Sequence, residues 1–168
     1  MKLRIAALIP LALAGAAAAF WSGCASLTLT GSRPPRVAGP PVDQKFVLGP
    51  AGFAAGDSIR IDSVECSSPD FAPGDRVIVH GWYDLNSRDR AVLGLFLTSN
   101  GASGRTRDSR SQIKRVERGV GPFALECVIA GDGALHVSYY PQGGGSSFGG
   151  IYFGTDAQMD WISGMNLW

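Results

Sequence analysis

The chain has 168 residues, of which 45% are hydrophobic, with 15 basic side chains against 14 acidic ones. Without Lys2 and Arg4 at its start, 13 basic residues face 14 acidic ones and the net charge is −1. These values predict a single domain with a substantial core, and they exclude the basic excess typical of nucleic-acid-binding proteins.

The first 23 residues have the layout of a secretory signal peptide. Lys2 and Arg4 give a positive start, and an apolar run over residues 5–20 leads through small residues to Cys24. The ending Ser22-Gly23-Cys24 resembles the lipobox of bacterial lipoproteins, whose cysteine is acylated and becomes the first residue of the mature protein. The resemblance implies an acylated Cys24 in membrane lipid. Ala25 after it implies the periplasmic face of the bacterial outer membrane.

Two other interpretations of this segment stay open. Cleavage after Ala17-Ala18-Ala19 would give an unlipidated periplasmic or secreted protein. A permanent membrane span is the other, although Pro10 interrupts the run and a span needs about 20 strongly apolar residues.

Residues 24–44 are rich in proline, which favours extended polyproline geometry. We expect a tether over residues 24–44, with an irregular arm lying on the domain as the alternative. The globular domain is then expected over residues 45–168.

The three cysteines are an odd number for an exported protein. If Cys24 carries lipid, Cys66 and Cys127 are left to pair in an oxidising compartment. Such a disulfide would stabilise the fold by roughly 4 kcal/mol on the chain-entropy model. The alternative is that both are buried and unbonded.

Beyond the tether, apolar and polar residues alternate with a period of two, which predicts β-strands. We expect strands at residues 45–48, 59–66 with a bulge near Asp62-Ser63, 76–83, 91–98, 112–117, 123–129, 134–140 and 148–153, and a strand or short helix at 156–162. Gly131-Asp132-Gly133 indicates a hairpin turn between two of them. The pattern predicts an all-β fold, an antiparallel Greek-key β-sandwich of about seven or eight strands.

Cys66, Trp82 and Cys127 follow each other with separations that resemble those of an immunoglobulin-like domain. The resemblance covers about residues 59–140. It implies a generic Greek-key sandwich and nothing about ligands.

Residues suited to catalysis or metal binding are scarce. His80 and His136 are the two histidines, and no nucleophile elbow, zinc motif or phosphate-binding loop is present. We therefore expect no catalytic site, cofactor or metal, with a small envelope hydrolase using one histidine and an aspartate as an alternative. Asp84, Asn86 and Asp89 offer oxygen ligands for calcium, but a polar turn explains them equally.

Residues 99–119 carry six basic side chains against Asp108 and Glu117, a net charge of +4. Guanidinium groups suit phosphate and carboxylate, so this stretch is a candidate site for an anion or a partner. The candidate residues are Arg105, Arg107, Arg110, Lys114 and Arg115. A solvated connection is the alternative.

Aromatic residues near the end of the chain form a second candidate surface. Tyr140, Tyr152 and Trp161, with Trp168, flank the glycine-rich loop at Gly143–Gly145 and could form a platform for a glycan. Equally, such residues often complete a core. The sequence thus predicts a lipid-anchored envelope protein that acts as a non-enzymatic structural or interaction module, with an envelope protein or glycan as partner. A carbohydrate-binding or cell-wall-binding module is the alternative.

Overall fold

The computed structural model of the chain describes residues 39–99 and 112–165, all within one compact unit, Arg33–Trp168. These residues form seven strands and one helix: β1 (Val42–Asp43), β2 (Val47–Phe53), β3 (Ser58–Cys66), β4 (Arg76–Ser99), β5 (Ile113–Val128), β6 (Gly133–Tyr140), β7 (Gly149–Gly154) and α1 (Asp156–Ser163). Every strand pair is antiparallel. The predicted all-β class is therefore confirmed.

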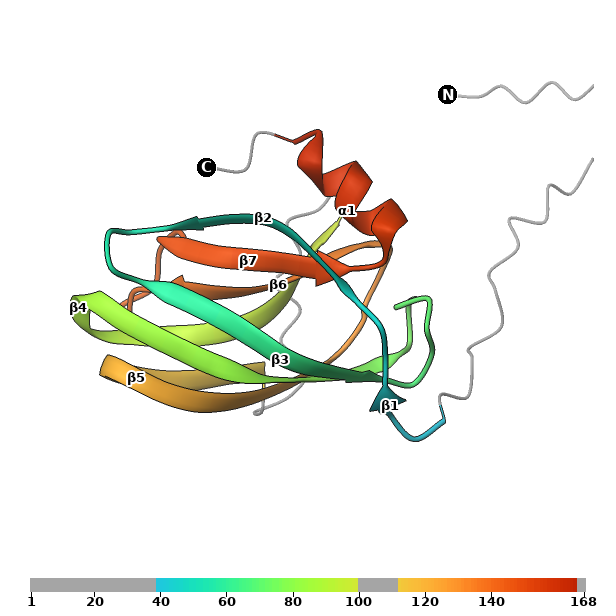
Figure 1. Cartoon of the computed structure of the whole chain (residues 1–168), viewed down its shortest axis with the longest axis horizontal. Coiled ribbons are helices and arrows are strands. Elements are labelled where there is room, and N and C mark those ends of the chain that lie inside the picture. Colours follow the sequence, from blue (N-terminus) through green and yellow to red (C-terminus); the bar gives the residue numbers. More distant parts are fainter. Residues whose placement is uncertain (1–38, 100–111, 166–168) are drawn as a thin grey trace, which may run out of the picture. The chain divides into compact units, whose positions relative to one another are not determined.

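The strands belong to one sheet in the order β1-β3-β4-β6-β7-β2, and β5 pairs with β4 beside this path (Figure 1). The sheet curls, so that β2, β7 and β6 lie over β3, β4 and β5. The sheet brings together strands far apart in the sequence, because Leu48 of β2 is the partner of Phe153 in β7. Short α1 lies beside β2 and β7 at one end of the curled sheet.

Strand β4 folds over on itself, and its ladder partners show why this is necessary. Arg76 at its start pairs with Val128, and Ser99 at its end pairs with Gly133. A straight strand of 24 residues would span roughly 80 Å. The short connection after Val128 reaches about 17 Å at most. The two halves of β4 must therefore lie in different layers of the curled sheet, as Figure 1 shows.

The corner of β4 lies between Leu85 and Arg90, where its register with β5 shifts. The β5 partners of these residues are Gly119 and Glu117, so residues 86–89 of β4 face Arg118 alone. Strand β4 thus has more residues at the corner than β5 and forms its outer side. Strand β5 forms the inner side and turns at Gly119, which has a φ of 110°. Such bends are how a strand passes from one layer to another.

Asp57 fixes this corner from below. Its carboxylate is buried and accepts hydrogen bonds from the backbone N–H of Asn86 (2.7 Å) and Ser87 (2.8 Å) and from the Ser87 hydroxyl (2.6 Å). Arg118 closes the other side, pairing with Asp89 at 2.9 Å and donating to the Asn86 carbonyl. The polar residues of the corner are therefore satisfied within the fold.

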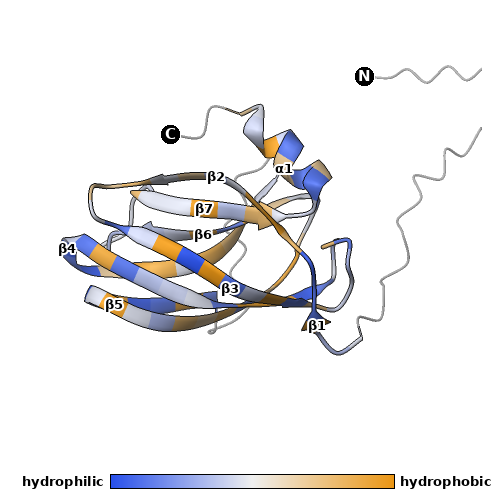
Figure 2. Ribbon diagram, viewed as in Figure 1, coloured by the Kyte–Doolittle hydropathy of each residue, from blue (hydrophilic) through white to orange (hydrophobic). Residues whose placement is uncertain are grey.

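Alternate residues of the strands face the core between the layers, as the stripes of Figure 2 show. The set expected on β5 is buried, namely Phe123, Leu125, Cys127 and Ile129. Tyr139 is fully buried among them, and its hydroxyl donates to the carbonyls of Ser58 (2.8 Å) and Asp84 (3.1 Å). Burial raises the pKa of Tyr139, so it stays a neutral hydrogen-bond donor.

The predicted bulge near Asp62-Ser63 is confirmed, because the β3–β4 register shifts between Ile61 and Ser63. Two other local predictions are wrong. Residues 84–89 do not separate two strands but form the corner of β4. The Gly131–Gly133 turn joins strands that both pair with β4 and not with each other, so it closes no hairpin.

The prediction of a disulfide between Cys66 and Cys127 is also wrong, because no bond joins these buried cysteines. Both are cross-strand partners of Val77, one on each side of β4. They are thus two strand spacings apart, about 9–10 Å, whereas a disulfide spans Cα atoms up to about 7 Å apart. Trp82 does not cover them from the core either, because it lies on the outer face and is 41% exposed.

The sheet begins within the predicted tether. Val42 and Asp43 pair with Cys66 and Glu65 of β3, and the Gln44 N–H donates to the Val64 carbonyl. The signal peptide at 1–23, Cys24 and the tether up to residue 38 lie outside the described residues. Within the described part of the chain, no helix has the length and hydropathy that a membrane span needs.

Candidate functional site

The connection between β3 and β4 is organised by Asp75, which is almost completely buried. Its carboxylate accepts hydrogen bonds from the hydroxyls of Ser67 (3.0 Å) and Ser68 and from the backbone N–H of Ala72 (2.8 Å). Charged acceptors make the stronger hydrogen bonds, particularly away from water. Asp75 therefore holds this connection in one conformation.

Within that connection, Phe71 has a φ of 49°, the left-handed region that bulky side chains rarely adopt. Its side chain is buried in the core, and its carbonyl accepts a hydrogen bond from Gln158 Nε2 at 3.3 Å. Such strain persists where the surroundings determine it, and it is frequent at ligand-binding sites. Phe71 is the strained residue of a candidate site.

Helix α1 is fixed against the same connection. Thr155 caps it by accepting from the Gln158 N–H at 3.3 Å, and Gln158 Oε1 accepts from the Thr155 N–H at 3.0 Å. Both ends of the Gln158 amide are therefore used, one for the cap and one for Phe71. Gln158 positions the helix relative to the strained connection.

A cavity of about 330 Å³ opens between α1, the β3–β4 connection and the β5–β6 turn. We call it the helix-side cavity, and the lining residues used below are Asp70, Pro73, Asp132, Gln158 and Trp161. It is of the size of small-ligand sites. Two carboxylates and an indole line it, and within residues 39–99 and 112–165 no basic residue does.

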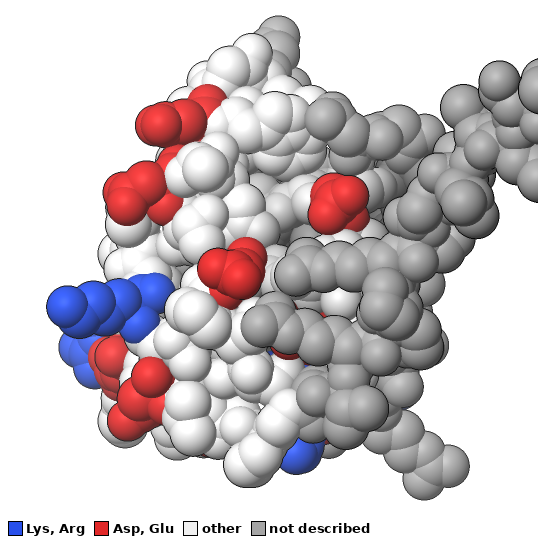
Figure 3. All heavy atoms as spheres, turned by 90° about the vertical axis from the view of Figure 1, so that its right-hand side faces the viewer, with Lys and Arg blue, Asp and Glu red and all other residues white. Residues whose placement is uncertain are grey.

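The surroundings of this cavity have the same sign. Asp156 and Asp160 of α1 are also exposed. Figure 3, which faces this end of the molecule, shows acidic side chains spread over the described surface and basic ones at its margin. Carboxylates accept hydrogen bonds from hydroxyl and ammonium groups, and they repel phosphate and carboxylate. The arrangement suits a neutral or cationic ligand with an apolar face.

A second cavity, of about 350 Å³, lies on the outer face of β4, β5 and β6. We call it the sheet-side cavity; its principal lining residues are Phe96, Ile113, Arg115, Tyr140 and Gly144. The rings of Phe96 and Tyr140 meet edge to face with centroids 5.3 Å apart. Its wall is apolar and aromatic, and Arg115 is its charged residue.

The three aromatic residues predicted as a glycan platform belong to an aromatic row of successive contacts between the two cavities. Tyr140 contacts Phe96, Phe96 contacts His136 and His136 contacts Tyr152, which shares an apolar cluster with Trp161. Trp161 lines the helix-side cavity and Tyr140 the sheet-side cavity. Tyr152 lies between them but is buried, and its hydroxyl lies 3.0 Å from Thr98 Oγ1. The structure therefore places one ring at each cavity and covers the middle one, while Trp168 lies outside the described residues.

The two histidines have separate neighbours. His80 Nε2 lies 3.3 Å from Glu65 on β3. His136 lies in the aromatic row, 4.9 Å from the Tyr152 ring centroid, with Nδ1 2.8 Å from Ser138 Oγ. Burial lowers the pKa of His136 to about 4, so it is neutral at physiological pH.

The predicted calcium ligands belong to the corner of β4. Asp84 accepts from the Asn86 amide at 2.7 Å, and Asp89 pairs with Arg118. Their carboxylate oxygens are thus used in contacts that stabilise the corner of β4. In the ranges 39–99 and 112–165, no group of three or more histidine, cysteine or acidic residues could hold a metal ion.

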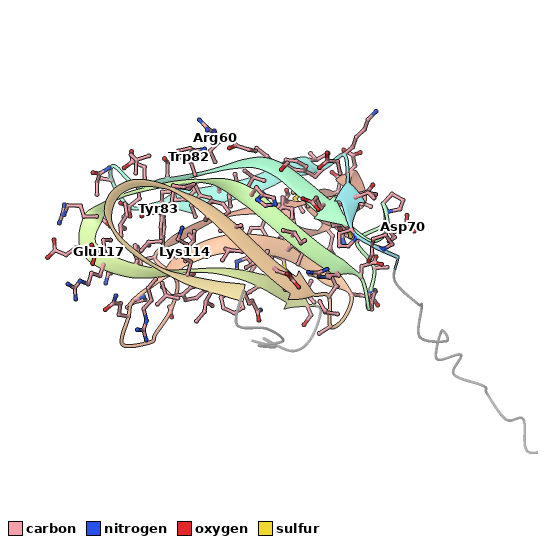
Figure 4. All side chains as sticks on the ribbon, turned by 90° about the horizontal axis from the view of Figure 1, so that it is seen from below. Arg60, Asp70, Trp82, Tyr83, Lys114 and Glu117 are labelled. Carbon is pink, nitrogen blue, oxygen red and sulfur yellow. The ribbon has the colours of Figure 1, made fainter. Side chains whose placement is uncertain are left out.

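The basic stretch is described in part. Arg105, Arg107 and Arg110 lie outside the described residues, while Lys114 and Arg115 are neighbours on β5. They point to opposite faces, because their β4 partners are Leu93 and Val92, consecutive residues of a strand. Lys114 donates to the Pro122 carbonyl, and Arg115 lines the sheet-side cavity (Lys114 is labelled in Figure 4).

A third feature is the outer face of β3, β4 and β5, centred on Trp82. Trp82 lies between its cross-strand partners Arg60 and Pro122, and Figure 4 shows Arg60 beside it. Val120 (67%) and Val128 (43%) are also markedly exposed along β5. An exposed apolar strip of this kind is suited to contact with a partner's surface.

Sequence reasoning found Trp161, Tyr140 and Arg115 but missed Asp70, Asp132 and Gln158. The segment around Asp132 was recognised as a turn, but nothing local shows that it meets the segment around Asp70, about 60 residues earlier, at one helix. Comparison of the chain with protein-family models, with curated proteins and with solved structures found no match.

Proposed function

We propose that the chain is a lipid-anchored interaction module of the bacterial cell envelope, without catalytic activity, whose helix-side cavity binds a glycan. The observation that supports this best is Trp161 in one cavity with Asp70 and Asp132. An indole offers the flat apolar surface on which a sugar ring packs, and carboxylates accept hydrogen bonds from its hydroxyls.

The charge of the cavity narrows the class of glycan. Asp70 and Asp132 disfavour phosphorylated or uronic-acid sugars, because like charges repel each other. A neutral or amino sugar remains. Strain at Phe71 and the buried carboxylate of Asp75 give the cavity a fixed shape before the ligand arrives.

The test is a tryptophan-fluorescence titration of the full chain in detergent with N-acetylglucosamine oligomers and, separately, galacturonate oligomers. We expect a saturable change with the first and none with the second. Trp161→Ala should abolish it, while Trp82→Ala, which removes an exposed indole elsewhere, should leave it intact.

Asp132→Asn is a second variant, because Asp132 is exposed and its replacement should not affect folding. We expect about a 3- to 10-fold loss of affinity for the neutral oligomer, as one hydrogen-bond acceptor weakens. Equal binding by wild type and Trp161→Ala would overturn the proposal. Preference for galacturonate would do the same.

The anchor and location are proposed from the sequence. Intact mass of the protein from a bacterial membrane fraction should show a chain that starts at Cys24 with added acyl mass. Cys24→Ser should lack that mass and appear in the soluble fraction. A chain that starts near Phe20 without lipid would instead indicate a periplasmic or secreted protein.

A protein partner is a second candidate function, favoured by the exposed strip at Trp82, Val120 and Val128. Crosslinking in intact cells should then capture an envelope protein through residue 82. Trp82→Ala should reduce that capture and leave sugar binding unchanged. Equal capture by the variant would exclude the strip.

We also infer that the curled sheet is a Greek-key sandwich of the immunoglobulin-like kind. The corner of β4 supports this, because it lays one part of the sheet over another. Two features of immunoglobulin-like domains are missing from the described residues, namely a Cys66–Cys127 bond and a buried position for Trp82. An experimental structure with two separate ladders over one core would establish it.

A further inference from the structure

We propose that the sheet-side cavity is a second binding site, independent of the glycan site, and that it takes a small carboxylate attached to an apolar or aromatic group. Three features support this site: the charge of Arg115, the rings that line the cavity and the partners of the neighbouring basic residues.

The other basic residues of β4 and β5 have partners. Arg76 pairs with Glu126 at 2.7 Å, Arg90 with Glu117 at 3.7 Å and Arg118 with Asp89 at 2.9 Å. Arg88 lies 4.2 Å over the Phe148 ring, and Lys114 donates to the Pro122 carbonyl. On these two strands, both described in full, Arg115 is the basic residue without an ion pair, side-chain hydrogen bond or ring contact within the described residues.

That guanidinium lies at an apolar cavity. Phe96, Ile113 and Tyr140 line it together with Arg115, and no acidic residue among those that the structure describes does so. Phe96 can lie flat against the sheet because residue 94 is glycine: a Cβ there would lie 2.3 Å from the Phe96 ring. Glycine at residue 94 thus lets the Phe96 ring lie over the strand, where it forms part of the cavity wall.

The ligand class follows from these two properties. A guanidinium binds a carboxylate in a two-pronged geometry, and the interaction is stronger where water is partly excluded. The aromatic wall contributes through burial of an apolar group, about 25 cal/mol per Å² of surface. A free inorganic anion would use the charge but not the wall, so the carboxylate should carry a ring or a branched aliphatic group.

The site differs in sign from the helix-side cavity, so the two should not compete. Asp70 and Asp132 repel a carboxylate, while Arg115 attracts it. Failure of sugar binding would therefore leave this proposal standing, and the reverse also holds.

The experiment is calorimetric titration of the full chain in detergent with 2-naphthoate, with 2-naphthamide as its neutral counterpart and acetate as the carboxylate without a ring. We expect naphthoate to bind at least 10-fold more tightly than either. Arg115→Gln should reduce naphthoate affinity at least 10-fold. Lys114→Gln removes the same charge from the adjacent residue and should change affinity less than 2-fold.

Two further measurements keep the result interpretable. Arg115→Lys retains the charge without the planar fork, and we expect an intermediate loss of about 3-fold. Saturating N-acetylglucosamine oligomer should leave naphthoate affinity unchanged. Equal affinity for naphthoate and naphthamide, or equal losses from Arg115→Gln and Lys114→Gln, would overturn the proposal.

Discussion

The two cavities are nearly equal in volume, about 330 and 350 Å³, but opposite in charge. The helix-side cavity is built from connections and a helix, with Asp70 and Asp132 at its wall. The sheet-side cavity is built mainly from side chains that stand on strands, with Arg115 as its charge. The same curled sheet can therefore present two sites of different selectivity. The charge of each cavity depends on whether a connection or a strand supplies its charged residue.

Their supports differ as well. The shape of the helix-side cavity depends on hydrogen bonds to Asp75 and Gln158. The sheet-side cavity borders Gly144, which lies in the exposed connection between β6 and β7. We expect substitutions that break polar contacts to affect the first cavity and leave the second intact.

Asp75→Asn should have the largest effect on this contrast. The new amide group would face the Ser67 hydroxyl and the Ala72 N–H, which now donate hydrogen bonds to the carboxylate, with an N–H donor of its own. We expect the free energy of unfolding to fall by about 2–4 kcal/mol. Urea denaturation measures the loss. Asp132→Asn, an exposed carboxylate of the same cavity, should change it by less than about 0.5 kcal/mol. Equal effects would show that Asp75 does not organise the connection.

His136, which lies between the cavities, should make stability depend on pH. Its pKa is about 4 in the folded protein and near 6.5 when unfolded. As pH falls from 6.5 to 4, the His136 side chain is protonated in the unfolded chain but stays neutral in the folded protein. The free energy of unfolding therefore falls by up to about 3 kcal/mol and then levels off below pH 4.

Denaturation across that range in wild type and His136→Gln isolates this effect, because the carboxylates titrate in both. The difference in unfolding free energy between the two proteins should be constant above pH 6.5 and change by up to about 3 kcal/mol between pH 6.5 and 4. His136→Gln should lack this part of the wild-type slope between pH 6.5 and 4. If His136→Gln had that slope too, His136 would not be its cause.

Gln158→Ala should have a moderate effect, because it removes both the helix cap and the contact with the Phe71 carbonyl. We expect a loss of about 1–2 kcal/mol, compared with about 1 kcal/mol for Thr155→Ala, which removes the cap alone. Hydrogen exchange of residues 69–73 should increase in the first variant and not in the second. Equal hydrogen exchange in the two variants would show that the contact between Gln158 and Phe71 does not stabilise the connection that lines the cavity.

Salt should have the smallest effect and separate the cavities by sign. Raising NaCl from 0.05 to 0.5 M screens a charge pair near the surface, so naphthoate affinity should fall about 3-fold. N-acetylglucosamine binding involves no ligand charge and should change by less than about 1.5-fold. Titrations at both salt concentrations check this, and equal dependence would remove the distinction.

Alternation along the chain predicted which residues face the core, but not which strands pair. Phe123 and Leu125 are buried as expected, and the bulge before Ser63 is present. Alternation carries no information on partners distant in sequence, so β5 and β6 were placed in one hairpin although both pair with β4. The interpretation of Cys66 and Cys127 failed for the same reason. Their positions depend on the register across β4.

The candidate sites were predicted unevenly. Arg115 and Trp161 were identified because arginine and tryptophan suit ligands wherever they lie. Residues 84–89 were interpreted as a loop because their polar side chains are typical of turns, whereas Asp57, 30 residues from Ser87, holds them in the corner of a strand. Only the folded chain shows that contact.

The pairing of β2 with β7 has a consequence for how the chain acquires its structure. Leu48 must find Phe153, 105 residues further along, before either strand gains its ladder. Contacts this remote in sequence form slowly, and closing such a loop costs conformational entropy beforehand. A ribosome-bound chain in which β7 has not yet been synthesised would present β2 as an unprotected edge. The β2–β7 ladder must therefore wait until residue 153 has been added, which leaves time for the chain to associate with helper proteins.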